Sequence, residues 1–353
     1  MTSFRQAWDL PTLPRPIVLI GAGAIVRTAH LPAYRRLAFP VAGLFDIRHE
    51  TAVETASDFD VPRVFDSLET AASDGARMNA VFDVAVPGGD VLPVLERLPR
   101  GAAVLIQKPM GETLDGARAI LRTCHERELT AAINFQLRFS PNTLAIRDMI
   151  ARGLLGEVVD IEVRLQVRQP WESWPFVRHA PRLEILYHSI HYLDTIRMLA
   201  GEPYGVYCRS VAHPLLPDCK DSRSSIILDY GNRVRCSLTL NHTHDYDWSY
   251  RASMMKIEGT TGAAIMTMGV NLDYPSGPRD TLEIASGRRW EPVPLRGSWF
   301  PEAFEGPMSN LQRFVAGEDP FLVSPVDDAI RTMALVEACY ISSDAGGTPI
   351  PEP

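Results

Sequence analysis

Lysine is rare in this sequence, because arginine fills most of its basic positions. Of 35 basic residues only three are lysines, and these are Lys108, Lys220 and Lys256. The formal net charge is -8, and no window carries the dense basic cluster that binding to a phosphate backbone requires. We therefore expect no nucleic-acid partner, and each lysine becomes a candidate for a role that arginine does not fill.

Cysteine pairs and long apolar runs are also missing. The five cysteines are odd in number, widely scattered and without a Cys-x-x-Cys pair, which argues against a disulfide framework or a zinc ribbon and favours a reducing cytoplasm. Residues 1–16 contain no apolar signal segment, and no run of about 18 apolar residues occurs. We therefore expect a cytoplasmic protein without a membrane span.

The first part of the chain contains short apolar runs. They stand at residues 17–20, 41–45, 80–86, 103–106 and 131–135, separated by segments of helix length. This alternation predicts a doubly wound parallel sheet, which we place at residues 16–134 after an N-terminal extension of residues 1–15. We expect helices over residues 50–59 and from residue 24, the second of which Pro32 should end or kink.

The pattern changes near residue 135. Polar and apolar residues alternate over residues 157–167, 224–228 and 235–240, which is the period of an antiparallel sheet with one solvated face. We therefore predict a second domain over residues 135–353. A last helix, at about residues 325–342, is expected to pack back on the first domain.

A glycine-rich turn follows the first apolar run. Gly21-Ala22-Gly23 lies between a predicted strand and a predicted helix, where glycines let a pyrophosphate approach and the first N–H groups of the helix, at Ala24 and Ile25, meet its charge. Val26 stands in place of the third glycine of the G-x-G-x-x-G pattern, which loosens the contact between helix and strand. The alternative is a tight turn without a ligand.

Asp46 follows the second apolar run, 25 residues after Gly21. A carboxylate at this place can accept both hydroxyls of a ribose and repel a 2′-phosphate, so NAD is favoured over NADP as the cofactor. Arg48 lies close in sequence and keeps NADP in consideration.

Lys108 and a group of histidines are the candidates for catalysis. Lys108 lies just past the run at residues 103–106, at the edge where open α/β sheets bind ligands. His188, His191 and Asp194 recur at three-residue intervals and share one face of a predicted helix. Their side chains could bind a metal, but no further ligand motif converges on them, so we predict no metal site. The alternatives are a solvated lysine and a hydrogen-bonded helix histidine.

Together these motifs resemble the Gfo/Idh/MocA family (glucose-fructose oxidoreductase, inositol dehydrogenase and MocA). The resemblance rests on the order of the glycine turn with His30-Leu31-Pro32-Ala33, Val86-Pro87, Gln107-Lys108-Pro109, Arg138-Phe139-Ser140-Pro141, His191-x-x-Asp194 and Glu258-Gly259-Thr260-Thr261-Gly262. It implies a Rossmann domain that also contacts the cofactor through Pro87 and Lys108, followed by an α/β domain with a large open, mainly antiparallel sheet. That sheet often mediates homodimers or homotetramers. The resemblance also implies NAD(P)-dependent oxidation or reduction of a sugar, inositol or related polyol.

Two positions depart from the family pattern. The glutamate of the family's E-K-P motif is Gln107 here, and its D-x-x-x-H dyad becomes Tyr187-x-x-x-His191. Lys108 and His191 still match catalytic positions of the family. Our hypothesis is that His191 takes the proton of a substrate hydroxyl while Lys108 donates a hydrogen bond to the developing alkoxide or carbonyl, as hydride passes to the nicotinamide. Tyr187 is a candidate to polarise His191 or contact substrate, and His188 is a second candidate base.

Substrate contacts are expected from Lys108, His188 and His191 and from two further segments. Asn134, Gln136 and Arg138 leave the last predicted strand of the first domain, where the alternative role is hydrogen bonding between domains. A proline-punctuated loop holds Trp171, Trp174, Arg178 and Arg182. Tryptophans suit the apolar face of a sugar ring and arginines suit a carboxylate, although packing of the loop also explains the tryptophans.

The sequence therefore predicts a dehydrogenase of a sugar, sugar acid or cyclitol. One alternative keeps NAD bound and uses transient oxidation for isomerisation, epimerisation or glycoside cleavage. Another is a non-catalytic, NAD-binding sugar sensor, for which Gln107 and Tyr187 leave room while Lys108 and His191 argue against it. A polar and aromatic cluster at residues 242–248 matches no metal template and is interpreted as an oligomer contact or a pocket rim.

Overall fold

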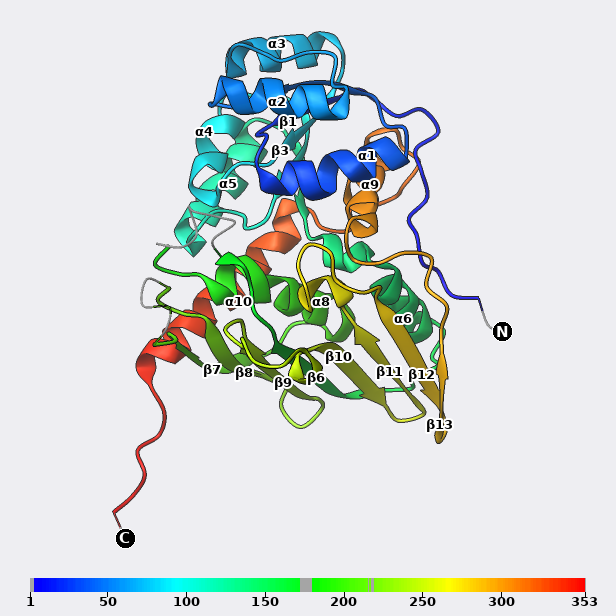
Figure 1. Ribbon diagram of the computed structural model, residues 1–353, viewed down its shortest axis with the longest axis vertical. Coiled ribbons are helices and arrows are strands. Elements are labelled where there is room, and N and C mark those ends of the chain that lie inside the picture. Colours follow the sequence, from blue (N-terminus) through cyan, green and yellow to red (C-terminus); the bar gives the residue numbers. More distant parts are fainter. Residues whose placement is uncertain (1–2, 172–179, 215, 217–218, 353) are drawn as a thin grey trace. The chain divides into compact units, whose positions relative to one another are not determined.

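Five parallel strands form the sheet of the first of two units. The computed structural model describes residues 3–171, 180–214, 216 and 219–352. One unit comprises Met1–Asp148 with Leu295–Met333, and the other Met149–Pro294 with Ala334–Pro353. The strands of the first unit, of which β1 and β3 are labelled in Figure 1, lie in the order β2-β1-β3-β4-β5. They are β1 (Ile17–Ile20), β2 (Val41–Phe45), β3 (Val81–Val84), β4 (Ala103–Gln107) and β5 (Thr130–Asn134).

These strands are short apolar runs buried on both faces, as parallel strands covered by helices must be. Every residue of β1, β3 and β4 is buried. The parallel register pairs Ile17 with Val81 and Gln107 with Asn134. The predicted doubly wound parallel sheet is thus confirmed, and its strands point their carboxyl ends to one common edge.

Helices connect the strands of the first unit. They are α1 (Leu31–Arg36), α2 (His49–Phe59), α3 (Leu68–Arg77), α4 (Val91–Leu95) and α5 (Leu114–Glu126). Helix α9 (Glu305–Val315), from the later part of the chain, connects none of these strands but packs against β4 and β5. Helix α3 begins at a capping box, in which the side chains of Ser67 and Thr70 each accept the backbone N–H of the other. Thr113 caps α5 by accepting the N–H of Gly116 at 3.1 Å.

Pro32 does not end the first helix. The helix begins at Ala24, widens into a π-helical turn at Val26–His30 and continues as α1, with Pro32 in the first turn of α1. Pro32 therefore lies inside a continuous helical segment, where its missing N–H leaves one helical hydrogen bond unmade, and the widened turn directly before it is where the helix departs from regular α geometry. The widened turn starts at Val26, the residue that replaces the third glycine, and Val26 is completely buried.

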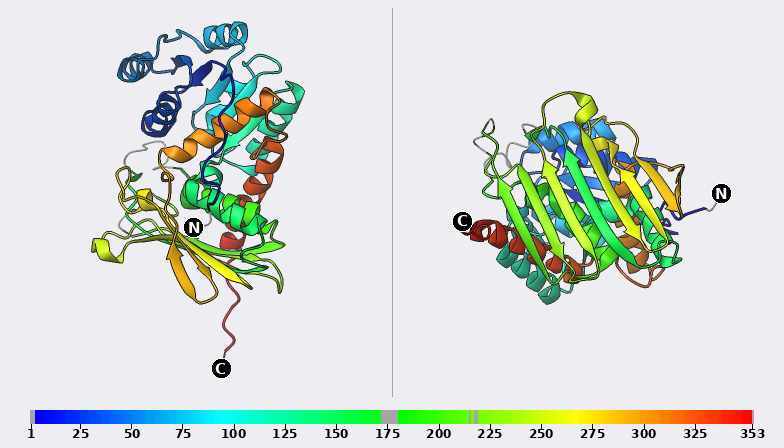
Figure 2. Two further views of the ribbon diagram at one scale, coloured as in Figure 1. Left: turned by 90° about the vertical axis from the view of Figure 1, so that its right-hand side faces the viewer. Right: turned by 90° about the horizontal axis from the view of Figure 1, so that it is seen from below.

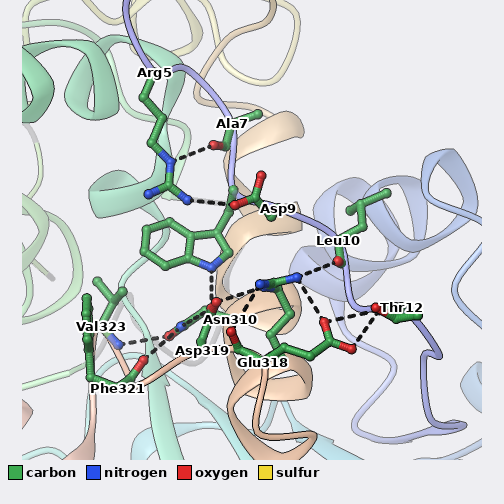
Figure 3. A network of polar contacts seen from close by, with 12 residues as sticks. Arg5, Ala7, Asp9, Leu10, Thr12, Asn310, Glu318, Asp319, Phe321 and Val323 are labelled. Carbon is green, nitrogen blue, oxygen red and sulfur yellow. Dashed lines mark hydrogen bonds and ion pairs between the residues drawn. The ribbon is translucent and has the colours of Figure 1, made fainter.

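The N-terminal extension is fastened to the first unit near the end of α9 (Figure 3). Trp8 Nε1 donates to Asp319 Oδ2 at 2.7 Å, and its ring meets the edge of Phe139 with centroids 5.3 Å apart. Arg313 binds Asp319 at 2.8 Å and also donates to the carbonyl of Leu10 at 2.9 Å. The extension is therefore a bound part of this unit.

Eight strands form the sheet of the second unit, whose strands lie side by side in the right-hand view of Figure 2. In the order β13-β12-β11-β10-β6-β9-β8-β7, only β6 and β9 pair in parallel. The strands are β6 (Val158–Gln166), β7 (Gly205–Val211), β8 (Arg223–Asp229), β9 (Arg235–Asn241), β10 (Ala252–Gly259), β11 (Gly262–Thr267), β12 (Thr281–Ser286) and β13 (Arg289–Pro292). This confirms the predicted large, mainly antiparallel sheet.

Burial alternates along the middle strands of this sheet, so one face packs inward and the other meets solvent. Tyr207 and Ile227 lie opposite each other on the solvent face and are 65% and 52% exposed. Lys256 continues this face on β10, where its Nζ lies 2.9 Å from Glu258 and 3.7 Å from Glu162. The open face thus combines an apolar pair with charged side chains.

Three further helices complete the described fold: α6 (Pro141–Ala151), α8 (Ile190–Ala200) and α10 (Val326–Ala345). The start of α10 belongs to the first unit, where Asp327 Oδ1 lies 2.8 Å from His125 Nε2. Its last turns follow the edge strand β7, where Ser342 accepts the N–H of Cys208 and Ser343 that of Ser210, both at 2.9 Å. These bonds occupy donors that an open edge would offer to another chain.

The state of the cysteines and the character of the helices bear on two further expectations. All five cysteines lie among the described residues, are buried and form no disulfide. Across the described ranges, none of the helices combines the length and apolar character needed to cross a bilayer.

Candidate active site

The carboxyl edge of the parallel sheet collects most of the residues that the sequence singles out. Gly21 follows β1, Asp46 follows β2 and Lys108 follows β4, while Asn134 ends β5. Strands β1 and β3 are neighbours whose connections leave in opposite directions, because β2 lies on one side of β1 and β3 on the other. In open α/β sheets a ligand binds in the crevice at such a reversal.

The glycine turn has the shape of a dinucleotide cradle. Gly21 has φ of +106°, and a Cβ there would lie 2.4 Å from the carbonyl oxygen of Ala85, so no other residue fits. At Gly23 a Cβ would meet no atom within 4 Å, which leaves space above the turn. The helix begins at Ala24, where its first N–H groups, those of Ala24 and Ile25 included, have no intrahelical acceptor. The turn therefore fits a pyrophosphate.

Asp46 is tied directly to this turn. Its Oδ2 accepts the backbone N–H of Ala22 and its Oδ1 that of Arg48, both at 2.8 Å. The carboxylate is thereby held at the end of β2 beside Gly21 and Gly23, where the ribose of a bound dinucleotide belongs. Arg48 Nε lies 3.8 Å from Asp46, and the arginine side chain is largely exposed. Pro87, at the end of β3, is exposed at the same edge.

Lys108 is half-buried at the carboxyl end of β4. Burial lowers the pKa of its ammonium group to about 8, so the side chain gives up its proton far more readily than a surface lysine. The side chain of Gln107 accepts the backbone N–H of Lys108 through Oε1 at 2.9 Å. The backbone of Lys108 is thus held in place, and the pKa of its ammonium group lies close to neutral pH.

A buried network behind Lys108 was missed by the sequence analysis. His30 Nδ1 lies 2.7 Å from Asp83 Oδ2, which also accepts the hydroxyl of Tyr34 at 2.7 Å, and His30 and Asp83 are completely buried. On its other side, His30 Nε2 lies 3.5 Å from Gln107 Nε2 and 3.4 Å from Asn134 Nδ2. With Nδ1–H donating to Asp83, Nε2 is an acceptor for both amides. Asp83 thereby orients the two side chains that end β4 and β5.

Asn134, Gln136 and Arg138 have different surroundings. Asn134 Oδ1 and Gln136 Oε1 are buried and make no hydrogen bond within the described chain, as expected of acceptors that a ligand completes. Arg138 instead donates at 2.6 Å to the carbonyl of Val323 and at 2.6 Å to Asp328 Oδ2. Its guanidinium is thus used within the first unit, which favours the structural role over a substrate contact.

The histidine helix belongs to the second unit. Tyr187 and His188 lie in a π-helical turn at Ile185–Ser189 that leads into α8, the helix of His191. His188 and His191 are buried, with ring centroids 6.4 Å apart. Tyr187 packs against a small apolar cluster that contains Trp171. Both histidines are therefore held in fixed positions on one helical face.

Several candidate substrate residues lie elsewhere. Trp174 and Arg178 are outside the described residues. Trp171 is buried against Leu183 and Cys219, so it packs the loop. Arg182 donates two hydrogen bonds to Glu337 at 2.6 and 2.8 Å, which uses its guanidinium within the second unit.

Comparison with known proteins places these features in a family. A family model described as an oxidoreductase family with an NAD-binding Rossmann fold matches residues 15–135, and the model of the Gfo/Idh/MocA C-terminal domain matches residues 143–265. The chain belongs to the Gfo/Idh/MocA family. The expected Rossmann domain and the expected family are thereby confirmed.

Individual Gfo/Idh/MocA proteins resemble the chain over most of its length. A D-apiose dehydrogenase of Paraburkholderia graminis is 24% identical over 345 residues, covering 94% of this chain and 88% of its own. An inositol 2-dehydrogenase of Rhizobium meliloti is 25% identical over 289 residues, with coverages of 79% and 82%. The crystal structure of an oxidoreductase from Agrobacterium radiobacter, in complex with NAD+, L-tartaric acid and magnesium, has a TM-score of 0.79 at 19% identity, covering 94% of this chain and 97% of that chain. At that identity the structure shows the shared fold alone.

Proposed function

We propose that this protein is a dehydrogenase that transfers hydride between NAD and a hydroxyl or carbonyl group of a sugar, sugar acid or cyclitol. The main support for this proposal is that the glycine turn, Asp46 and Lys108 lie at the same edge of the parallel sheet, and that burial lowers the pKa of the Lys108 ammonium group. The relatives named as dehydrogenases of apiose and inositol support a polyhydroxylated substrate.

NAD is the proposed cofactor, and NADP is the less favoured one. The turn at Gly21 and Gly23, with the N–H groups of Ala24 and Ile25, would hold the pyrophosphate, and Pro87 would contact the cofactor from the end of β3. Asp46 would bind the ribose and repel a 2′-phosphate. When bound, NAD supplies the hydride acceptor of the reaction.

Lys108 and His191 are the proposed catalytic residues. His191 removes the proton of the reacting hydroxyl, while Lys108 donates a hydrogen bond to that oxygen as negative charge develops on it. A pKa of about 8 leaves Lys108 mostly protonated at neutral pH and still able to exchange its proton. Tyr187 is proposed to polarise His191 or contact substrate in place of the family's aspartate, and His188 is the second candidate base.

The substrate is proposed to contact Lys108, His188 and His191 together with the amides of Asn134 and Gln136. The two buried amide oxygens suit hydroxyl donors, because each is an acceptor without a partner in the described chain. Trp174 and Arg178 remain predicted contacts, for a sugar ring and for a carboxylate.

A substrate panel tests this proposal. The purified protein is incubated with NAD and a library of polyols, aldoses and sugar acids, and NADH is measured against product. Stoichiometric NADH supports the dehydrogenase, whereas product without net NADH indicates transient oxidation with retained NAD. Binding of NAD and ligand without any turnover would overturn the enzyme proposal and favour a sensor. A parallel titration with NADP tests the cofactor preference.

The open sheet of the second unit is the proposed oligomer interface. Tyr207 and Ile227 supply an adjacent exposed apolar pair on a face that other strands continue with charged groups. We propose a homodimer or homotetramer in the cytoplasm, and sedimentation of the wild type and of Ile227→Glu tests it. A monomeric wild type would contradict this proposal.

A further inference from the structure

Three ionisable side chains meet inside the second unit beneath the start of α8. Glu184 directly precedes the π-helical turn, His188 lies within it, and His242 directly follows β9. One potential ligand atom from each residue lies within 4.8 Å of the others. His242 Nε2 is 3.1 Å from Glu184 Oε1, and the imidazole centroids of His188 and His242 are 4.3 Å apart. The helical turn and the strand end thus bring two imidazoles and a carboxylate to one point.

The cluster is buried and has a second carboxyl group beside it. Glu184 and His242 are completely buried, and among the described residues the ion pairs of Glu184 include neither lysine nor arginine. Asp221 is a second buried carboxyl group close by, since its Oδ1 accepts the backbone N–H of Leu183, the residue before Glu184, at 2.7 Å. A carboxylate in such a position costs free energy unless a cation or strong donors compensate it. The surroundings of Glu184 therefore favour a positive charge at this point.

Some potential ligand atoms of the cluster make no hydrogen bond to another described residue. The hydroxyl of Ser189 donates to Glu184 Oε1. Glu184 Oε2 and His242 Nδ1 nevertheless make no hydrogen bond within the described ranges. His242 is completely buried, and a neutral imidazole offers a lone pair on one of its ring nitrogens. Buried atoms without partners are typical of places that water or an ion completes.

We propose that Glu184, His188 and His242 bind a divalent transition-metal ion of the zinc class. Two imidazoles and a carboxylate form a donor set that holds Zn²⁺ with a fourth position open to water or another ligand. Ligands about 2.1 Å from a tetrahedral ion are separated by about 3.4 Å, close to the 3.1 Å between His242 and Glu184. The wider pairs must move closer as the ion binds. As a ligand, His188 would position the helix that carries His191 instead of acting as a second base.

Metal binding is tested directly, without reference to activity. The full chain is dialysed against a chelator, its metal content is measured, and it is titrated with Zn²⁺ and separately with Co²⁺. We expect about one ion per chain and, for Co²⁺, the visible absorption of a tetrahedral site with nitrogen and oxygen ligands. The assignment is supported if His242→Ala and Glu184→Gln each lose the bound ion, with an affinity for Zn²⁺ reduced by about 100-fold or more.

His244→Ala is the matched control. His244 is also buried, lies two residues after His242 and is paired with Gln166 at 3.1 Å, so its loss removes a buried histidine from outside the cluster. It should bind metal as the wild type does, and circular dichroism checks that each variant is folded. A wild type that binds no Zn²⁺ overturns the proposal whatever the variants do. Unchanged binding in folded His242→Ala and Glu184→Gln also overturns it, because the ion would then lie elsewhere.

Discussion

Replacing Lys108 by methionine should stabilise the fold while it removes the proposed catalytic ammonium. Burial lowers the pKa of Lys108 from a usual 10.5 to about 8, so the folded state holds this proton less tightly than the unfolded chain does. At about 1.36 kcal/mol for each pH unit, this difference corresponds to about 3.4 kcal/mol of lost folding free energy at neutral pH. Because the residue is only half-buried, solvent screening reduces this figure, and we expect a gain of about 2 kcal/mol for Lys108→Met.

The pH dependence of this gain identifies its cause. The cost of the buried ammonium is fully present below pH 8 and fades as the pH rises from about 8 towards 10.5, where the unfolded chain also loses the proton. The stability difference between Lys108→Met and wild type should therefore be smaller at pH 9 than at pH 7. A gain from better packing of the methionine side chain would not change with pH.

The assay is chemical denaturation of both proteins without cofactor at pH 7, 8 and 9. Lys256→Met is the control, since Lys256 is a more exposed lysine whose pKa is raised by its hydrogen bond to Glu258. Its replacement should cost less than about 1 kcal/mol. The reasoning is refuted if Lys108→Met is no more stable than wild type at pH 7, or if its gain is the same at pH 7 and pH 9.

Three further predictions follow from the first unit. Asp46→Ser removes the carboxylate that faces the glycine turn, so the KM for NAD should rise about 10-fold or more while that for NADP does not; equal changes in both would contradict the ribose role. Asp83→Asn keeps an oxygen at this place but weakens the hydrogen bonds from His30 and Tyr34, because an amide oxygen is a weaker acceptor than a carboxylate; it should lower the free energy of unfolding by about 2 kcal/mol in denaturant titrations, whereas an unchanged midpoint would refute the buried network. Trp8→Ala removes the bond to Asp319 and should make the N-terminal extension more sensitive to limited proteolysis than in wild type, with resistance equal to wild type as the contradicting result.

The parts of the fold that depend on neighbouring residues could be predicted from the sequence. The apolar run at residues 103–106 falls within β4, and Lys108 follows it at the binding edge as expected. The strand, turn and helix around Gly21 are local in the same way, since the turn itself requires a positive φ at Gly21, whereas the contact with Ala85 that also excludes a Cβ is long-range. Pro32 shows the limit of this reasoning, because the helix continues past it through a widened turn instead of ending there.

Pairings between distant residues could not be predicted in this way. His30 and Asp83 are 53 residues apart, and each resembles an ordinary helix or strand residue until the sheet brings them together. Arg138 was interpreted from its position at a strand exit, but its partner Asp328 is 190 residues away. Glu184 and His242 likewise have no spacing that links them, since they come from a helix start and a strand end that are 58 residues apart. A sequence pattern identifies side chains with useful chemistry but does not show which distant residue each of them contacts in the fold.

The most direct test of the account is the turnover of Lys108→Ala with the best substrate of the panel, measured together with its affinity for NAD. We predict that kcat/KM falls by about 100-fold to 10,000-fold, as expected for the loss of a group that acts on the reacting oxygen. NAD should still bind, because the glycine turn and Asp46 are unchanged. A variant that binds NAD and turns over at nearly the wild-type rate would contradict the assignment of Lys108 as a catalytic residue.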